Sequence, residues 1–206
     1  AVALDVAKEW IGRGHIRFGA LSGGYGDKVL SDKSYEPLWQ ALDAARAFVF
    51  FHPGECADGR LTAFYLSNLL GNPYETAVAI GHLAFGGVFE RHSNIRFGFA
   101  HGGGVAPMLA GRFERGFDTA RPGIDTKAAA PRKLFRNICV DCITHDPDSL
   151  ALAESVFGET QVLFGSDWPF PMGYPEPHAQ LATLDGVRRK RIFCDNPERL
   201  IKETTR

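Results

Sequence analysis

The stretch VLFGSDWPFP, residues 162–171, indicates how this chain folds and where its chemistry lies. Val162, Leu163 and Phe164 are apolar in unbroken succession, which predicts a strand that is buried on both faces. The strand runs on into Asp167, and the prolines that follow restrict the backbone of the outgoing loop. We therefore expect a carboxylate held in one direction at the edge of a sheet.

The same pattern recurs along the chain, where unbroken apolar strands alternate with helices. Such alternation is typical of the α/β class with a parallel sheet. The segments share one period without a compositional break, which predicts a single domain over residues 1–206. Strands are predicted at 15–22, 48–53, 95–101, 137–145 and 162–165. Helices are predicted at 34–47, 60–71, 74–92, 146–158 and, as two short pieces, within 186–205.

Helix ends can also be predicted from residue type. Ser34 and Asp146 are expected to cap the N-termini of their helices, since short polar side chains accept hydrogen bonds from free amides there. Gly71 and Gly158 are expected to end helices. Asp195 is expected to start the second of the two C-terminal helices.

The bulk composition narrows the functional classes. A net charge of -1 gives no electrostatic basis for binding nucleic acid or an anionic membrane surface. No apolar run reaches the roughly 18 residues of a membrane helix, and Asp5, Lys8 and Glu9 interrupt the N-terminus where a signal peptide would be apolar. Four cysteines are too few for a disulfide framework at this length, so we expect a reducing, cytoplasmic location.

Three predicted strands end on a residue that can bind a metal or move a proton: His52, His101 and Asp167. In a parallel α/β barrel the active site lies at the C-terminal ends of the strands, so these side chains are expected to share one mouth. Each has a structural alternative when taken alone. A histidine at a strand end is more often a hydrogen-bonded structural residue, and an aspartate there is often a cap or turn residue.

Other motifs are less specific. HGGG at 101–104 could be a tight turn or an oxyanion-hole loop, but the G-x-S-x-G motif that accompanies such loops in esterases is missing from the sequence. Cys139 and Cys142 would point to opposite faces of a strand, which argues against a redox or metal-binding pair. The glycine-rich segment 19–27 fits neither the dinucleotide fingerprint nor the P-loop.

The combination of FFHP, FAHGGGVAPMLAGRFERGF, THDPDSL and LFGSDWPFP, in this order, is far more specific. It resembles the amidohydrolase-related decarboxylases and hydrolases typified by aminocarboxymuconate-semialdehyde decarboxylase, from about Gly14 to the C-terminus. The resemblance implies a TIM (β/α)8 barrel that holds one divalent metal, usually zinc. It implies that His52 and Asp167 are metal ligands and that His101 is a catalytic acid/base. These residue types suit such roles.

The resemblance also suggests how the substrate is held. Arg112 matches an arginine that reaches across a dimer interface in the decarboxylase and holds a substrate carboxylate, a task suited to the guanidinium fork. Tyr65 falls near the position of an aromatic pocket residue. A homodimer acting on a small carboxylic acid is therefore implied.

The sequence departs from the family pattern in one large respect. The family takes two further metal ligands from a His-x-His at the end of its first strand, and this chain has no His-x-His. A barrel has eight strands in about 250 residues, whereas five strands are predicted here. We therefore expect the chain to hold strands four to eight, with the N-terminal part of the barrel missing, and to bind zinc poorly on its own.

Three functions remain open from the sequence. The favoured one is a metal-dependent decarboxylase of a carboxylated aromatic or muconate-like acid, because Arg112 and the HGGG segment match that branch. The second is a metal-dependent hydrolase or hydratase that acts on a lactone, amide or enol acid. The third is an inactive remnant or structural subunit.

Overall fold

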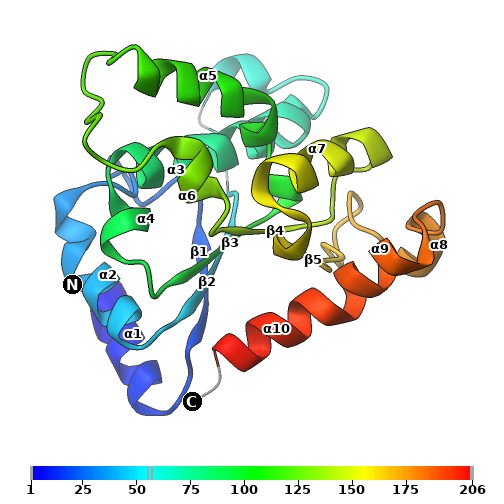
Figure 1. The fold of residues 1–206 in the computed structure, drawn as a ribbon, viewed down its shortest axis with the longest axis horizontal. Helices are drawn as coiled ribbons and strands as arrows, with labels where there is room; N and C mark the ends of the chain where they lie inside the picture. The colour runs from blue at the N-terminus through cyan, green and yellow to red at the C-terminus, as the bar shows by residue number, and fades with distance from the viewer. Residues whose placement is uncertain (1, 55, 57, 205–206) are drawn as a thin grey trace.

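The computed structural model describes residues 2–54, 56 and 58–204, which form one parallel sheet with helices packed against it (Figure 1). The strands are neighbours in the sheet in the order of the sequence, and every neighbouring pair is parallel. Successive parallel neighbours joined by helical crossovers are the repeating unit of a (β/α)8 barrel, which confirms the predicted fold class. The strands are β1 (Arg17–Leu21), β2 (Phe48–His52), β3 (Arg96–Phe99), β4 (Cys139–Asp141) and β5 (Val162–Leu163).

One helix, α1, precedes the first strand, helices α2 to α7 lie between the strands in sequence, and α8, α9 and α10 follow the last strand. No helix in the described ranges has the length and apolar character needed to cross a membrane. The helices are α1 (Val2–Gly12), α2 (Glu36–Ala44), α3 (Asn72–Phe85), α4 (Val88–Arg91), α5 (Ala106–Asp118), α6 (Pro131–Phe135), α7 (Pro147–Phe157), α8 (Pro177–Gln180), α9 (Gly186–Lys190) and α10 (Asn196–Glu203).

Alternate strand residues face the helices and build the main core. Phe51, Phe97 and Phe99 are at most 2% exposed, and the rings of Phe51 and Phe99 stack with centroids 5.1 Å apart. Each such ring contributes on the order of 1.5–3 kcal/mol of burial free energy. On the opposite face, Leu200 of α10 packs with Cys139 and Leu163. This face is thus covered at β4 and β5, whereas Arg17, Gly19 and Leu21 of β1 are exposed, so the predicted burial on both faces is wrong for β1.

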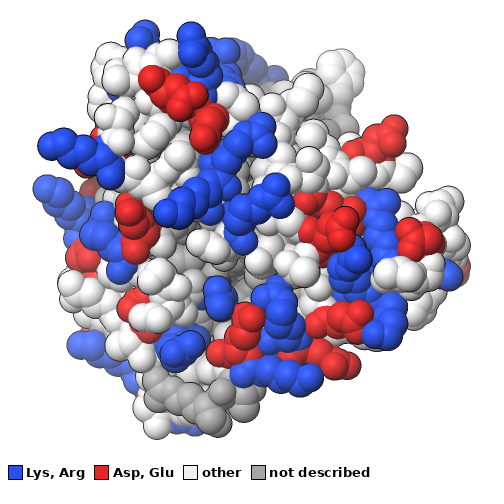
Figure 2. All heavy atoms as spheres, viewed as in Figure 1, with Lys and Arg blue, Asp and Glu red and all other residues white. Residues whose placement is uncertain are grey.

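The outer surface carries charges of both signs. Figure 2 shows acidic and basic side chains interleaved along α9 and α10. Arg188 and Glu154 pair at 2.8 Å, and Arg191 pairs with Glu159. The opposite charges offset one another locally over this part of the surface.

The N-terminus of α7 is capped as predicted. The carboxylate of Asp146 accepts a hydrogen bond from the amide of Ser149 at 2.7 Å, and Gly158 follows the helix with a φ of 107°. The amide of Ser149 lowers the pKa of Asp146 below its ordinary value. A group whose pKa is lowered by folding stabilises the protein above its ordinary pKa, and this contribution is lost as the pH falls.

The variant Asp146→Ala is therefore expected to unfold at a lower urea concentration than the wild type at pH 7. The difference should shrink as the pH falls below about 4, because the protonated carboxyl is a weaker acceptor. Urea titrations at several pH values measure this difference in unfolding midpoint. Asp148→Ala, which removes another carboxylate from the first turn of the same helix, is the control. A difference between wild type and variant that does not change with pH would contradict the capping role.

The predicted start of α2 is wrong. Asp32, not Ser34, accepts the capping bond, from the amide of Ser34 at 2.8 Å. A 3-10 turn at Lys33–Tyr35 then leads into α2. Asp32 lies two residues before Ser34, so its carboxylate is placed to accept from the free amide of Ser34.

Two predicted helix boundaries are also wrong, for one reason. Gly71 does not stop a helix, because a π-helical turn at Ser67–Gly71 continues directly into α3. A second π-helical turn, Arg191–Asp195, joins α9 to α10, so Asp195 starts no separate helix (Figure 1). Each π turn comes just before an Asn-Pro pair. Proline lacks an N–H and clashes with the carbonyl four residues earlier, and a wider turn relieves both problems.

Candidate metal centre and active site

The ends of three strands bring the predicted metal-binding side chains together. His52 is the last residue of β2, His101 lies just beyond β3, and Asp167 lies beyond β5. One ligand atom from each lies within 4.8 Å of the other two. The Nε2 of His52 is 3.2 Å from Oδ1 of Asp167, and the Nε2 of His101 is 3.7 Å from its Oδ2. The three side chains therefore converge at one edge of the sheet, as expected from the sequence.

The ring of His52 is oriented by its surroundings. Its Nδ1 lies 2.8 Å from the carbonyl oxygen of Pro53, which can only accept, so Nδ1 carries the proton. In this tautomer the lone pair of Nε2 is directed at Oδ1 of Asp167, 3.2 Å away, where a shared cation would be bound by both. The ring of Phe170 stacks on that of His52 at a centroid distance of 6.2 Å. A carbonyl partner of this kind is how metal-binding histidines are usually held.

The HGGG segment is a left-handed turn. The φ angles of His101, Gly102, Gly103 and Gly104 are 57°, 62°, 82° and 62°. A Cβ on Gly102 would lie 2.5 Å from Thr144, and one on Gly104 would lie 2.2 Å from the carbonyl oxygen of Pro73. Glycine is therefore required both by conformation and by space. Of the two alternatives open from the sequence, the structure shows the tight turn.

Two of the converging residues have unusual backbone conformations. His101 and Asp167 have φ angles of 57° and 53°. For a residue with a side chain, the left-handed region costs roughly 1–2 kcal/mol. Residues held in such conformations cluster at functional sites, where the surrounding structure over-determines them. Two of the three converging residues are thus strained, as are five other non-glycine residues of the described chain: Arg46, Phe64, Tyr65, Ala120 and His145.

One residue of the site was missed by the sequence analysis. Asp141, the last residue of β4, is 5% exposed. Its Oδ1 accepts hydrogen bonds from the amides of Gly102 at 2.9 Å and Ile143 at 3.0 Å. The available signal was the same as for Asp167, a carboxylate at the end of an apolar strand. The sequence of that strand was interpreted through its two cysteines, Cys139 and Cys142, and the carboxylate between them was not considered.

Burial and neighbouring charges set the protonation of the centre. Burial lowers the pKa of His101, while Asp141 and Asp167 oppose this effect. Burial raises the pKa of Asp141, and His101 together with backbone amides opposes it. A histidine with a lowered pKa is neutral at neutral pH. Neutral imidazole is the form that binds a metal or accepts a proton.

The two cysteines beside this centre are not reactive groups. Burial raises the pKa of Cys139 to about 11 and that of Cys142 to about 12. Cys139 packs with Leu200, whereas Cys142 belongs to the main core between sheet and helices. Thiols of this kind stay protonated and inert, which agrees with the expectation against a redox or metal-binding pair.

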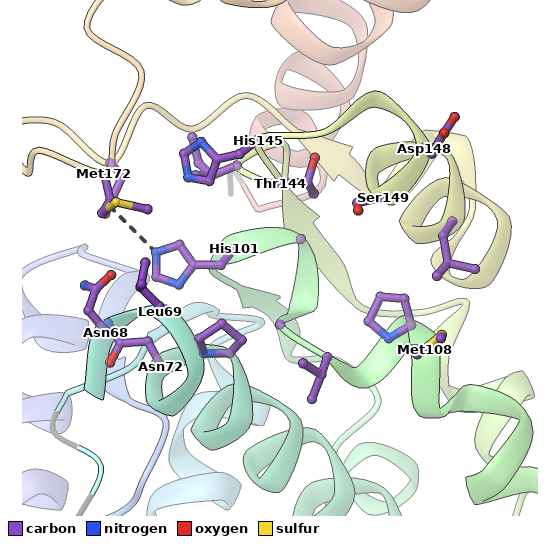
Figure 3. A pocket seen from close by; sticks show the side chains of 18 residues that line it. Asn68, Leu69, Asn72, His101, Met108, Thr144, His145, Asp148, Ser149 and Met172 are labelled. Atoms are coloured by element: carbon purple, nitrogen blue, oxygen red, sulfur yellow. Dashed lines mark ion pairs between the residues drawn. The ribbon is translucent and has the colours of Figure 1, made fainter. Parts of the chain in front are cut away.

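A cavity of about 610 Å³ adjoins the centre (Figure 3). His101 and Asp167 line it, and Asn68 and Asn72 lie across from His101. The remaining lining is mixed, with Thr144, His145, Asp148 and Ser149 on one wall and Leu69, Val105, Met108, Ile143, Leu152 and Met172 among the apolar residues. Among the described residues, no lysine or arginine lines this cavity.

The two predicted substrate-binding residues lie elsewhere. Arg112 is exposed on α5, and Tyr65 is 55% exposed in the loop before α3. Neither belongs to the lining of the cavity within this chain. Their roles therefore stay predictions, and both would require contacts from outside the described chain.

The donor set fits a divalent metal. Imidazole and carboxylate are ligand types of catalytic zinc sites, which usually have three protein ligands. His52 and Asp167 supply one of each type, and His101 lies beside them. Their ligand atoms converge within 4.8 Å, and the free lone pair of His52 points into this group. The residues of this chain could thus hold a metal.

Comparison with known proteins agrees with this geometry. A model of the amidohydrolase family matches residues 3–202. The 2-amino-3-carboxymuconate-6-semialdehyde decarboxylase of Dictyostelium discoideum is 39% identical over 149 residues, which are 71% of this chain and 41% of that protein. The chain therefore spans less than half the length of this relative.

Solved structures show the same fold at lower identity. The 5-carboxyvanillate decarboxylase of Sphingomonas paucimobilis has a TM-score of 0.83 at 19% identity, over 97% of this chain and 63% of that one. A 5-carboxyvanillate decarboxylase of Novosphingobium aromaticivorans, solved with bound manganese, has a TM-score of 0.83 at 15% identity, over 97% and 61%. The family match, which covers nearly the whole chain, is the decisive finding: this chain belongs to the amidohydrolase family.

Proposed function

We propose that these residues form the larger part of the active site of a metal-dependent decarboxylase that acts on a carboxylated aromatic or muconate-like acid. The observation that carries the proposal is the convergence of His52, His101 and Asp167 beside the 610 Å³ cavity. The names of the relatives favour decarboxylation over other reactions of the family. The activity belongs to the complete protein.

Within this proposal, His52 and Asp167 are metal ligands and His101 is the acid/base. A bound divalent metal would polarise a substrate oxygen as a Lewis acid. In decarboxylation a C–C bond breaks, CO2 leaves, and a C–H bond forms at the same carbon. His101 lies at the cavity wall and is the group placed to hold and move that proton.

The cavity supports a substrate with one ring or a similar planar acid. Its volume of about 610 Å³ falls within the usual range for small-molecule sites. The side-chain amides of Asn68 and Asn72 can bind a hydroxyl or carbonyl substituent, while Leu69 and Met172 contact the apolar part. We propose zinc as the metal, because the two proposed ligands, the imidazole of His52 and the carboxylate of Asp167, are both ordinary zinc ligands.

We further propose a homodimer in which Arg112 serves the pocket of the second copy. This follows from the resemblance and from two observations: Arg112 is exposed, and no described lysine or arginine lines the cavity. Tyr65, which is exposed and lies three residues before Asn68 of the cavity lining in the sequence, is proposed to contact the substrate or the partner. The cysteines of the chain are free thiols, which supports a cytoplasmic location.

The test is to incubate the metal-loaded complete protein with a panel of carboxylated aromatic and muconate-like acids and to measure CO2 release. We expect metal-dependent CO2 release from at least one acid, and zinc in elemental analysis of the purified protein. Hydrolysis or hydration without CO2 release would instead support the second function. A protein that contains no metal and turns over no substrate would support an inactive remnant.

A further inference from the structure

We propose that Asp141 is a positioning residue for this reaction: its buried carboxylate fixes the left-handed turn that presents His101 to the metal centre. The inference rests on the acid/base role of His101 in the proposed function. It adds a residue that does not itself line the cavity and is not one of the three converging groups, but that binds the amides of two lining residues, Gly102 and Ile143.

The first observation is the pair of hydrogen bonds that Asp141 accepts. Its Oδ1 binds the amide of Gly102, the residue after His101, at 2.9 Å, and the amide of Ile143 at 3.0 Å. Both donors belong to buried residues. Without the carboxylate these amides would be left unpaired away from water, which is costly. Asp141 therefore ties the residue next to His101 to the end of β4.

The second observation is that the turn needs an external anchor. The three residues after His101 are glycines, and all four residues have positive φ angles. Glycine permits this conformation but permits many others equally well, and His101 itself adopts it at an energetic cost. The segment cannot hold this shape by local preference alone. A rigid acceptor on a neighbouring strand supplies the missing restraint.

The third observation is that Asp141 also adjoins the strand that leads to Asp167. A Cβ on Gly165 would lie 2.9 Å from the Cβ of Asp141 and 3.4 Å from its Oδ2. The thiol of Cys142 donates to the carbonyl of Gly165 at 3.6 Å. Asp141 thus sits between the strand ends that carry His101 and Asp167, and its position fixes one relative to the other.

The experiment is a double-mutant cycle on the complete metal-loaded protein, with Asp141→Ala, His101→Ala and the double variant. Displacement of a catalytic group by about 1 Å can cost about 100-fold in rate, so Asp141→Ala is expected to lower kcat about 100-fold with KM and metal content little changed. In the His101→Ala background the same change should cost less than about threefold, because there is no longer a side chain to position.

Two further variants sharpen the result. Asp141→Asn keeps an oxygen acceptor of the same shape and is expected to retain kcat within about tenfold of wild type. Asp43→Ala is the matched control, since Asp43 also accepts from a backbone amide, that of Asn94 at 2.9 Å. Asp43 lies on α2, does not line the cavity, and binds a residue before the start of β3, whereas the site lies beyond the ends of the strands. It should lower stability without lowering kcat. If Asp141→Ala does not fold, Asp141→Ser, which is too short to reach both amides, replaces it in the cycle.

Equal losses of kcat in the two backgrounds would overturn the proposal, because a purely structural role acts independently of His101. A loss in Asp141→Asn as large as in Asp141→Ala would also overturn it, since charge and not hydrogen bonding would then matter. Normal turnover of the single variant His101→Ala would refute the proposed function itself, so the two failures are told apart.

Discussion

Replacement of His101 by alanine is expected to lower kcat by about 100- to 10,000-fold and to leave the metal content near that of the wild type. The reason is that His52 and Asp167 already approach each other at 3.2 Å, while His101 lines the cavity and lies 3.7 Å from Asp167. Decarboxylation kinetics on the best substrate and elemental analysis measure the two quantities on one preparation.

The comparison variants are His52→Ala and Asp167→Asn, which remove a proposed ligand. Both are expected to lower metal content and activity together, and added metal at high concentration should partly restore them. The side chain of His101 is 16% exposed, against 39% for His52, so alanine at 101 also leaves the larger buried void. Thermal unfolding of all three variants separates that packing effect from catalysis. If His101→Ala loses metal as completely as the other two, His101 is a third ligand and another group must move the proton.

The sequence predicts the sheet well because its signal is local. Each strand is an unbroken apolar run, and residues such as Phe51 and Phe99 are buried where such runs predict burial. The site residues His52 and Asp167 are predictable for a related reason: His52 is the first polar side chain of its apolar run, and Asp167 is the first charged side chain after its strand. Parallel strands bring such positions to one edge of a sheet, so chain order alone places them together.

What the sequence does not predict depends on contacts between distant segments. The hydrogen bond from Gly102 to Asp141 joins residues 39 apart, and nothing within the strand of Asp141 indicates its partner. The π turns before Pro73 and Pro197 are likewise invisible to rules that treat proline as a break. At each of these prolines the π turn continues directly into the following α-helix, although local sequence preference would end the helix there.

The second large effect is expected from Gly104→Ala. Gly104 has a φ of 62°, and a Cβ there would lie 2.2 Å from the carbonyl oxygen of Pro73 and 3.0 Å from its Cα. The same carbonyl accepts a hydrogen bond from the amide of Val105 at 3.2 Å. The added methyl must therefore displace backbone, either at the start of α3 or in the turn that carries His101. No flexible side chain can yield in its place.

Gly104 has a φ of 62° and a ψ of -132°, a sparsely populated conformation that costs a residue with a side chain about 1–3 kcal/mol. Overpacking against backbone typically adds about 1–3 kcal/mol. We therefore expect Gly104→Ala to lower the free energy of unfolding by about 2–6 kcal/mol, measured by urea titration of the complete protein. Gly186→Ala is the matched control, because a Cβ at Gly186 meets nothing within 4 Å and its φ is ordinary. Since the displaced backbone adjoins both Pro73 and His101, the variant should also lose activity at temperatures where it remains folded. Wild-type stability in Gly104→Ala would show that the turn does not approach α3 this closely in solution. The structural explanation of why glycines follow His101 would then be wrong.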